Sequence, residues 1–368
     1  MTRTTPDAVR YYHTARTAHL ERLSTFSPAW FLYTRTRDDF DVELAESQLF
    51  TRRVSSVGAA IHVLRTRPRI LEVPEALAIR LWPHLLLLQT AVKLGQIGRR
   101  RKTMIVSYCM ENYPADEKLR EFTKLPKFVS RLITKTVASY LIRTTDRLVF
   151  ATADAEETYR ALVPRAMNRT RLDHSLVWAL PAGRDDESEA LESTVPLRMV
   201  FLGTFEARKG IHRLMAAWPL VRESIPEATL LLLGKSGDIE AVRLFASADR
   251  SVELVEDPPR DTIFAELSAA KALTLFSQPS RGWKEQVGLP IVEALSVGCE
   301  IVSSDETGIR AWLQENGHQV VPWDAPVEVL ARSMVHALHS SRTRAEIIGQ
   351  LPEVDGRLAA DTSLTRAI

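Results

Sequence analysis

The sequence predicts an α/β protein with two Rossmann-like domains that face a cleft, and three observations lead to this prediction. From about residue 198 onward, short apolar segments alternate with amphipathic ones, which is typical of a parallel, doubly wound sheet. The first half of the chain repeats this alternation less regularly. Between the halves lies a polar, acidic segment bounded by prolines, residues 181–196, which is predicted to be a linker.

The second half of the chain contains six apolar segments short enough to be buried strands. Each is followed by a segment with helical spacing of its apolar residues, and the last of these helices ends near residue 340. The predicted strands are residues 197–205, 228–234, 251–256, 272–277, 300–304 and 318–323.

The first half of the chain is predicted to hold a second α/β domain over residues 25–180. Its strands are expected at residues 29–36, 69–76, 103–112 and 146–153, with a long helix over residues 127–147. Residues 1–24 are predicted to form a separate amphipathic helix. The domain after the linker is expected to span residues 197–343 and to be followed by a C-terminal helix over residues 344–368.

Composition and charge exclude several classes of protein. Hydrophobic residues make up 45% of the 368 residues and charged residues 26%, as in a soluble globular protein. Cys109 and Cys299 are the only cysteines, which excludes a disulfide scaffold and a cysteine-rich zinc protein. The beginning of the sequence has no apolar signal core, and the apolar region 81–95 is too short and too interrupted to span a bilayer. A cytoplasmic location is therefore expected.

The net charge of +2 is unevenly distributed along the chain. Residues 1–190 carry +8 and the remainder carries −6. This asymmetry suggests that the two domains face different partners. The basic half could meet an anionic membrane surface, a nucleic acid or an anionic substrate.

The segment "WKEQVGLPIVEALSVGCEIVSS", residues 283–304, predicts an anion site between a strand and a helix. Pro290 suits the first helical position, and Gly288 permits a tight turn. The N–H groups of Gly288 and Leu289 would then point toward a bound phosphate, with the favourable end of the helix dipole behind them. Glu285 and Glu293 on either side could accept hydrogen bonds from hydroxyls, as the sugar and ribose of a nucleotide sugar would require.

An alternative explanation needs no ligand. Glu285 would then be a solvated loop residue, and Glu293 a carboxylate favoured near a helix start. A second segment, "GTFEARKG" at residues 203–210, favours the ligand site, because Arg208 and Lys209 end a loop after a strand of the same sheet and could neutralise a diphosphate. Taken alone, these two residues would be read as a solvated basic pair.

Together these segments resemble the C-terminal domain of retaining glycosyltransferases with the GT-B fold, specifically glycosyltransferase family four (glycosyl transferases group 1). The resemblance covers roughly residues 145–345 and rests on "GTFEARKG", "LLGKSG" and "EQVGLPIVEALSVG". It implies that Lys209 binds the donor diphosphate, that Glu285 contacts the transferred sugar and that Glu293 contacts the ribose. The amides of Gly288 and Leu289 would hold phosphate. The C-terminal helix would cross back to the N-terminal domain, which would bind the acceptor.

The chain departs from the family pattern at several positions. Many members have arginine directly after the loop glycine, Gly203, where this chain has Thr204, and Gln286 stands where glycine is usual. Gly203, Thr204 and Arg208 are nevertheless expected to line the donor site. On the acceptor side, Glu111 follows the predicted strand 103–112 and is a candidate catalytic residue beside Lys209 and Glu285, although a surface glutamate next to a helix-capping Asn112 explains it equally well.

The resulting expectation is an enzyme, a retaining glycosyltransferase that moves a sugar from a nucleotide-diphosphate sugar to an acceptor hydroxyl on a glycan or lipid-linked precursor. No metal and no cofactor besides the donor are expected. A non-catalytic homologue that binds a nucleotide sugar as a scaffold stays open, as does a nucleotide-sugar epimerase or sugar phosphorylase of the same architecture.

Basic amphipathic segments suggest how the first domain meets its surroundings. In the predicted helix 127–147, Lys127, Arg131 and Lys135 lie at four-residue spacing beside apolar residues, and residues 95–102 add a basic cluster. A basic amphipathic helix can lie on an anionic membrane, although a core-facing helix with a solvated basic face has the same pattern. Peripheral attachment to the inner face of the membrane is expected. Nucleic-acid binding is not, because no aromatic residues are interleaved with the basic clusters.

Overall fold

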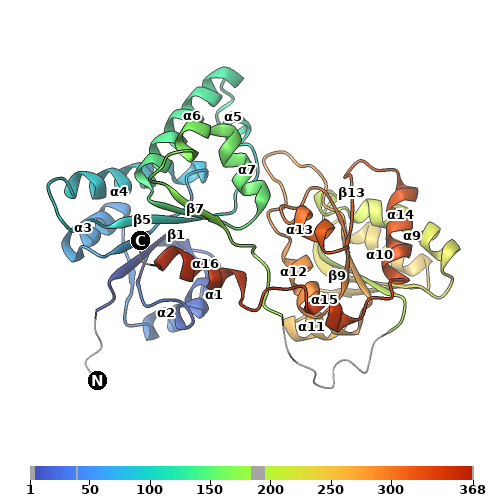
Figure 1. The fold of residues 1–368 in the computed structure, drawn as a ribbon. Coiled ribbons are helices and arrows are strands. Elements are labelled where there is room, and N and C mark those ends of the chain that lie inside the picture. The colour runs from blue at the N-terminus through green and yellow to red at the C-terminus, as the bar shows by residue number, and fades with distance from the viewer. Residues whose placement is uncertain (1–4, 39, 184–194, 367–368) are drawn as a thin grey trace. The chain divides into compact units, whose positions relative to one another are not determined.

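The computed structural model describes residues 5–38, 40–183 and 195–366, and it divides into two compact units. The N-terminal unit comprises Met1–Trp178 together with Arg357–Ile368, and the C-terminal unit comprises Ala179–Gly356. Most of the predicted linker, residues 184–194, lies outside the described residues. Each unit contains one parallel sheet with helices, which confirms the predicted fold class (Figure 1).

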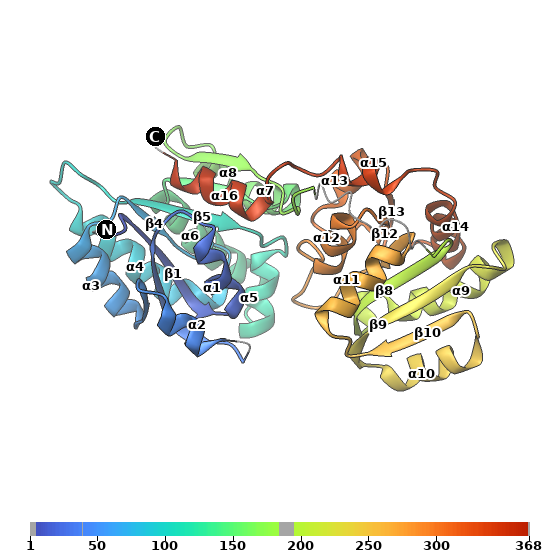
Figure 2. The same cartoon turned by 90° about the horizontal axis from the view of Figure 1, so that it is seen from below.

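The sheet of the N-terminal unit has seven parallel strands in the order β3-β2-β1-β4-β5-β6-β7. Helices α1, α2 and α16 lie on one face of this sheet and helices α3, α4 and α6 on the other (Figures 1 and 2). The strands are β1 (Ala8–Ala15), β2 (Trp30–Thr36), β3 (Thr51–Arg53), β4 (Ile70–Glu72), β5 (Met104–Cys109), β6 (Arg147–Phe150) and β7 (Asp173–Leu176).

Helices in the N-terminal unit are mostly short, and α6 is the longest of those described. None of the described helices combines the length and apolar character that crossing a bilayer requires. The helices are α1 (Thr17–Glu21), η1 (Arg22–Ser24), α2 (Val42–Ser47), α3 (Ser56–Thr66), η2 (Ile79–Leu81), α4 (Trp82–Gly95), α5 (Ala115–Thr123), α6 (Lys127–Thr144), α7 (Ala153–Leu162), α8 (Pro164–Met167) and α16 (Gly356–Thr365).

The sheet of the C-terminal unit has six parallel strands in the order β10-β9-β8-β11-β12-β13. The strands are β8 (Arg198–Phe205), β9 (Thr229–Gly237), β10 (Val252–Glu256), β11 (Ala272–Leu275), β12 (Glu300–Ser304) and β13 (Gln319–Val321). The helices are η4 (Ala207–Lys209), α9 (Ile211–Ser224), α10 (Ile239–Ala248), α11 (Arg260–Ala269), α12 (Leu289–Ser296), α13 (Arg310–Glu315), α14 (Val327–Leu338) and α15 (Arg344–Ile348). Every residue of β11 and β12 is buried, as expected for strands covered by helices on both faces.

The prediction of a separate helix over residues 1–24 was wrong, because residues 8–15 form β1 in the middle of the first sheet. The helical interpretation depended on treating the charged residues of this segment as solvent-facing. In the structure Arg10 is 3% exposed, and its guanidinium pairs with Glu72 at 2.7 Å and with Asp361 at 2.5 Å. A charge can occupy a central strand when it is paired in this way.

The last helix, α16, packs on the sheet of the N-terminal unit although it follows the C-terminal unit in sequence. Ala360 and Leu364 are buried in a cluster with Ile70, Val106 and Val149. In addition, the buried guanidinium of Arg147 donates to the carbonyl oxygens of Ser363 and Arg366, at 2.8 and 2.9 Å. A cation at a helix C-terminus satisfies carbonyls that have no partner within the helix.

Replacing Asp361 by alanine is expected to destabilise the N-terminal unit by about 3 kcal/mol, because it removes one of the two carboxylates that pair with buried Arg10. It also removes the acceptor of the Ser27 amide, which lies 2.8 Å from the carboxylate. Urea unfolding measures the effect. Thr362→Ala, at the exposed neighbouring position on the same helix, is the control and should change stability by less than about 0.5 kcal/mol. Equal effects of the two substitutions would contradict the structural role of this ion pair.

Candidate functional site

The C-terminal sheet reverses its strand order between β8 and β11, which lie side by side. The connections after these two strands therefore leave the sheet in opposite directions. In open α/β sheets, ligands bind at the carboxyl ends of the strands at such a point. The loop after β8 carries Lys209, and the loop after β11 carries Glu285, so both predicted residues lie at the switch point.

The structure brings Lys209 and Glu285 into direct contact. The Lys209 Nζ pairs with the Glu285 Oε2, and the hydroxyl of Ser277 donates to the same oxygen at 3.2 Å. Both side chains are largely buried, with exposed fractions of 13% and 11%. The carboxylate is thus held by a cation and a hydroxyl at the end of β11, where either group could be shared with a ligand.

An aromatic ring also lies against the basic end of the first loop. Trp283, two residues before Glu285, places its ring 4.5 Å from the guanidinium carbon of Arg208 and 5.1 Å from the Nζ of Lys209. Arg208 also pairs with Glu206 at 2.5 Å. Cations over an aromatic face are attracted by its negative charge density. Trp283 therefore restrains both basic residues of the predicted donor site.

α12 begins where the sequence predicts it, with Gly288 directly before the helix and Pro290 in its first turn. Gly288 is the residue before the helix and has φ of 84°, a conformation that favours glycine. Leu289, the first helical residue, is exposed, and the first N–H groups of a helix have no partner within the helix. Glu293 follows one turn later and is partly buried, and burial raises the pKa of its carboxyl, with Arg260 opposing the shift. The structure places Glu293 on the same helix end as the amides.

The end of β8 comes unusually close to β9. Gly203 pairs with Gly234, and a Cβ added at Gly234 would lie 1.9 Å from the Gly203 carbonyl oxygen, so no other residue fits there. Next to it, the hydroxyl oxygen of Thr204 is buried and has no hydrogen-bond partner among the described residues. An unpaired buried hydroxyl costs about 1–3 kcal/mol, which a ligand atom could recover.

On the N-terminal unit, Glu111 is engaged in local contacts after β5. Its carboxylate pairs with Lys118 and accepts from the Tyr113 amide at 3.2 Å, and the residue is 8% exposed. Asn112 is buried beside it. Glu111 is therefore not the surface glutamate of the alternative explanation, and Asn112 does not cap α5, whose N-cap residue is Pro114. The contacts of the Glu111 carboxylate among the described residues of this unit are thus with Lys118 and the Tyr113 amide, neither of which is a predicted catalytic group.

Glu75, after β4, is a half-buried carboxyl that sequence reasoning missed. Its Oε2 accepts from the amides of Met110 and Glu111 at 3.1 and 3.0 Å and from the Tyr159 hydroxyl at 3.0 Å. Burial, reinforced by the nearby Glu111 carboxylate, raises the pKa of Glu75 to about 7, although these hydrogen bonds act in the opposite direction. Glu75 thereby fixes the backbone that carries Glu111.

A pH-dependent stability difference is expected from Glu75. Its pKa in the folded chain lies above the ordinary value of 4.5, so folding favours the protonated form, and the stability it contributes is lost as pH rises from about 4.5 to about 7. Relative to Glu75→Gln, the wild-type chain should lose up to about 3 kcal/mol of unfolding free energy across this range, at about 1.4 kcal/mol per pKa unit. Urea unfolding at pH 5 and pH 7.5 tests this. The control is Glu21→Gln, at an exposed site, for which the difference in unfolding free energy from the wild type should be the same at both pH values. If the difference between the wild type and Glu75→Gln were also the same at both pH values, the pKa of Glu75 would not be raised.

A second polar group lies near the switch point of the N-terminal sheet, between β1 and β4. The rings of His13 on β1 and His84 on α4 stack with their centroids 4.1 Å apart. His84 Nδ1 lies 2.7 Å from the Ser56 hydroxyl, which lies 2.9 Å from the Tyr11 hydroxyl. Burial and the neighbouring His84 lower the pKa of His13, so the neutral ring is favoured. His13 Nδ1 has no partner among the described residues.

Signals for some of the missed residues were present in the sequence. Ser277 ends the predicted strand 272–277 and Trp283 opens the segment chosen for its glutamates, so both lie at a strand's carboxyl end. Glu75 likewise ends the predicted strand 69–76. No signal in the sequence indicated that His13 and His84, which are 71 positions apart, would stack.

Comparison with known families gives a match within the C-terminal unit. Residues 196–340 match the family described as glycosyl transferases group 1. The phosphatidyl-myo-inositol mannosyltransferase of Mycobacterium tuberculosis strain H37Rv is 29% identical over 160 residues, which are 41% of this chain and 40% of that protein. The enzyme of the same name from Mycolicibacterium smegmatis is 27% identical over 161 residues, 42% of this chain and 39% of that protein. The chain thus spans about 40% of the length of the curated relatives it matches.

Solved structures extend the likeness in fold to nearly the whole chain. The lipopolysaccharide outer core galactosyltransferase WaaB has a TM-score of 0.66 at 14% identity, covering 97% of this chain and 99% of its own. The structure of HepE from Anabaena in complex with UDP has a TM-score of 0.63 at 13% identity, covering 97% and 94%. HepE has also been solved with UDP-glucose, with a TM-score of 0.58 at 11% identity and the same coverage of 97% and 94%.

Proposed function

We propose that this chain, which belongs to the glycosyl transferases group 1 family through residues 196–340 and has a GT-B fold, is a retaining glycosyltransferase that uses a nucleotide-diphosphate sugar. The donor would bind the C-terminal unit and the acceptor the N-terminal unit. The observation that carries this proposal is the contact between Lys209 and Glu285 at the switch point of the C-terminal sheet. The complexes of HepE with UDP and UDP-glucose, in a protein of the same fold, support this donor class.

The proposed reaction breaks the bond between the sugar's anomeric carbon and the diphosphate oxygen and forms a bond from that carbon to the acceptor oxygen. The bonding electrons leave with the diphosphate, and the proton of the acceptor hydroxyl passes to the departing diphosphate oxygen. Stabilising the charge on the leaving diphosphate is therefore the main task of the protein. Lys209 supplies a cation for it, and Arg208 a second one. No metal ion and no further cofactor are needed.

The start of α12 contributes to the same task. The amides of Gly288 and Leu289 would donate to phosphate oxygens, with the positive end of the helix dipole behind them. Glu285 would accept a hydrogen bond from the transferred sugar and Glu293 from the ribose. The buried hydroxyl of Thr204, next to Gly203, would complete its hydrogen bonding with a donor oxygen, which accounts for its lack of a partner in the described chain.

The acceptor would be a hydroxyl of a glycan or a lipid-linked precursor. The names of the relatives support this class, since they include a mannosyltransferase for a phosphatidyl-inositol and a galactosyltransferase of lipopolysaccharide. On this chain, the neutral His13 ring with its unpaired Nδ1 is suited to hydrogen bonding with a hydroxyl. Glu111 would act through its buried carboxylate after β5, with Glu75 as the residue that positions it.

A donor panel tests the proposal. Calorimetry with UDP-glucose, UDP-galactose and GDP-mannose should show saturable binding of at least one, and release of nucleoside diphosphate should depend on added membrane or glycan extract. Glu285→Ala should reduce both. If none of the nucleotide sugars bound, the transferase assignment would be wrong. Binding without transfer to any acceptor would favour a non-catalytic sugar-nucleotide scaffold instead.

The N-terminal unit would attach to an anionic membrane surface through α6. Two apolar side chains of α6, Phe128 and Leu132, are 75% and 66% exposed. Arg131 and Lys135 lie three residues after each of them, so they share the same face of the helix. Apolar side chains among cations are typical of peripheral membrane helices. Flotation with anionic vesicles should therefore show binding that salt weakens and that Phe128→Ala with Leu132→Ala abolishes. Equal binding to neutral vesicles would contradict this attachment.

A further inference from the structure

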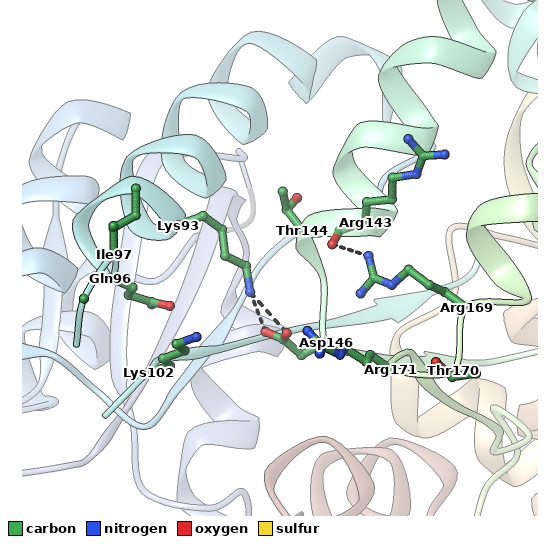
Figure 3. A pocket seen from close by; sticks show the side chains of 11 residues that line it. Lys93, Gln96, Ile97, Lys102, Arg143, Thr144, Asp146, Arg169, Thr170 and Arg171 are labelled. Atoms are coloured by element: carbon green, nitrogen blue, oxygen red, sulfur yellow. Dashed lines mark hydrogen bonds and ion pairs between the residues drawn. The ribbon is translucent and has the colours of Figure 1, made fainter. Parts of the chain in front are cut away.

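A basic cavity lies at the amino ends of the strands of the N-terminal sheet, away from the edge that carries Glu75 and Glu111. It has a volume of about 800 Å³. Its walls come from the end of α4, the end of α6 and the segments that enter β5, β6 and β7. The charged residues lining it are Lys93, Lys102, Arg143, Asp146, Arg169 and Arg171 (Figure 3).

Two of these cations are fixed by the protein itself. Lys93 Nζ contacts both carboxylate oxygens of Asp146, at 2.8 and 3.1 Å, and Asp146 is held in turn by the Ile105 amide at 2.8 Å. Arg169 donates to the carbonyl oxygen of Arg143, and Figure 3 shows both contacts. The cavity therefore has a cation-bearing wall whose geometry is set before any ligand arrives.

Two further cations have nothing in the described chain to neutralise them. Lys102, two residues before β5, and Arg171, two residues before β7, are exposed, and neither side chain has an ion pair or hydrogen bond with a described residue. The guanidinium of Arg143 points away from Asp146 in Figure 3, so it does not add to the positive charge around this carboxylate. Among the described residues that line this cavity, four cations then face it, and Asp146 is the one carboxylate.

The negative charge at two helix ends offsets only part of the positive charge of these cations. The C-terminal ends of α4 and α6 lie at the cavity, and each is equivalent to roughly half a negative charge. Together with Asp146 they offset about two of the four cations. The excess of about two positive charges matches one phosphate group, which carries about −1.5 to −2 near neutral pH.

We propose that this cavity is a binding site for a phosphate group, separate from the donor site of the C-terminal unit. Lys102 and Arg171 would close on the phosphate oxygens, while Lys93 and Arg169 form the fixed wall. The ligand could be a soluble phosphate or the phosphomonoester headgroup of a lipid, because Ile97 in the cavity wall is 75% exposed and would face an acyl region. Both sources share the same chemistry and require the same cations.

Calorimetric titration with inorganic phosphate at low ionic strength tests the site. The titrations use the full-length chain carrying Lys209→Ala, so that phosphate binding at the proposed donor site is weakened and is the same in every variant compared. The chain should bind phosphate, and adding Lys102→Ala with Arg171→Ala should weaken binding at least about tenfold. The matched control adds Arg22→Ala with Arg65→Ala, two exposed cations of the same unit that do not line the cavity, and should bind as before.

Vesicles distinguish the two sources of phosphate. If a lipid is the source, vesicles with phosphatidic acid should bind better than vesicles with phosphatidylglycerol, and only the Lys102→Ala, Arg171→Ala chain should lose this preference. If the parent chain and the Lys102→Ala, Arg171→Ala chain both keep the preference for phosphatidic acid, while the second no longer binds inorganic phosphate, the ligand is a soluble phosphate. Absence of phosphate binding in the parent chain, or equal loss in the cavity and control variants, would overturn the proposal.

Discussion

Replacing Lys209 by alanine is expected to lower kcat/KM for sugar transfer by about a hundred- to a thousandfold. Losing one group that stabilises the charge developing in a transition state typically has this effect. The loss should appear in kcat as well as in donor affinity, because the charge on the diphosphate grows as the bond to the sugar breaks. Steady-state kinetics with the donor identified from the panel, measured by release of nucleoside diphosphate, gives both quantities.

Lys235 provides a matched control for this substitution. It lies near the end of the neighbouring strand β9, its side chain is 66% exposed, and it pairs with Asp257 rather than with a residue of the donor site. Lys235→Ala should therefore leave kcat/KM within about twofold of the wild-type value. If Lys209→Ala behaved in the same way, the diphosphate would be bound elsewhere and the assignment of Lys209 would be wrong.

A double-mutant cycle shows whether Lys209 and Glu285 act as a unit. Lys209→Ala leaves a largely buried carboxylate without its cation, so part of its effect belongs to Glu285. Combining it with Glu285→Gln removes that stranded charge. The double variant should then be less impaired than the product of the two single effects, whereas strict multiplication would mean that the two side chains act independently.

The sequence was sufficient to predict the C-terminal unit because local and global signals agree there. The strands β8 and β11 are mostly apolar and buried, and loops with glycine follow them, so the sequence pattern alone places Lys209 and Glu285 at the carboxyl edge of one sheet. The contact between them was not predictable, since it depends on the strand order, which sets β11 beside β8 although 66 residues separate Phe205 from Ala272. The ring of Trp283 was missed for the same reason.

The N-terminal unit was harder to predict because charged residues occupy its interior. Arg10 and Arg147 lie within strands and are 3% and 1% exposed, which breaks the apolar pattern that identifies a buried strand. Their partners, Asp361 on α16 and the carbonyls at its end, come from the last residues of the chain. A pattern within one segment cannot reveal a partner more than 200 positions away. The short strands β3 and β7 were also missed, because their sequences, TRR and DHSL, lack the run of apolar residues that indicates a buried strand.

Gly210→Ala is expected to destabilise the C-terminal unit by about 3 kcal/mol or more and to lower donor binding at the same time. Gly210 has φ of 79°, which costs any other residue about 1 kcal/mol. An added Cβ would also lie 2.0 Å from the carbonyl oxygen of Phe276. The backbone of Gly210 and the backbone of Phe276 both lie at the switch point, next to Lys209 and Ser277 respectively. Relieving the clash must therefore move one of these two residues, which hold Glu285.

Gly317→Ala separates the clash from the backbone strain. Gly317 lies in the same unit with a similar φ of 76°, but its added Cβ would meet only the end of the flexible Arg342 side chain, at 3.3 Å. This variant should lose about 1 kcal/mol and keep donor affinity. Urea unfolding and calorimetry on both variants give the comparison. Equal losses of stability would mean that the loops after β8 and β11 do not approach as closely as the structure places them, and the proposed donor site would lose its geometric basis.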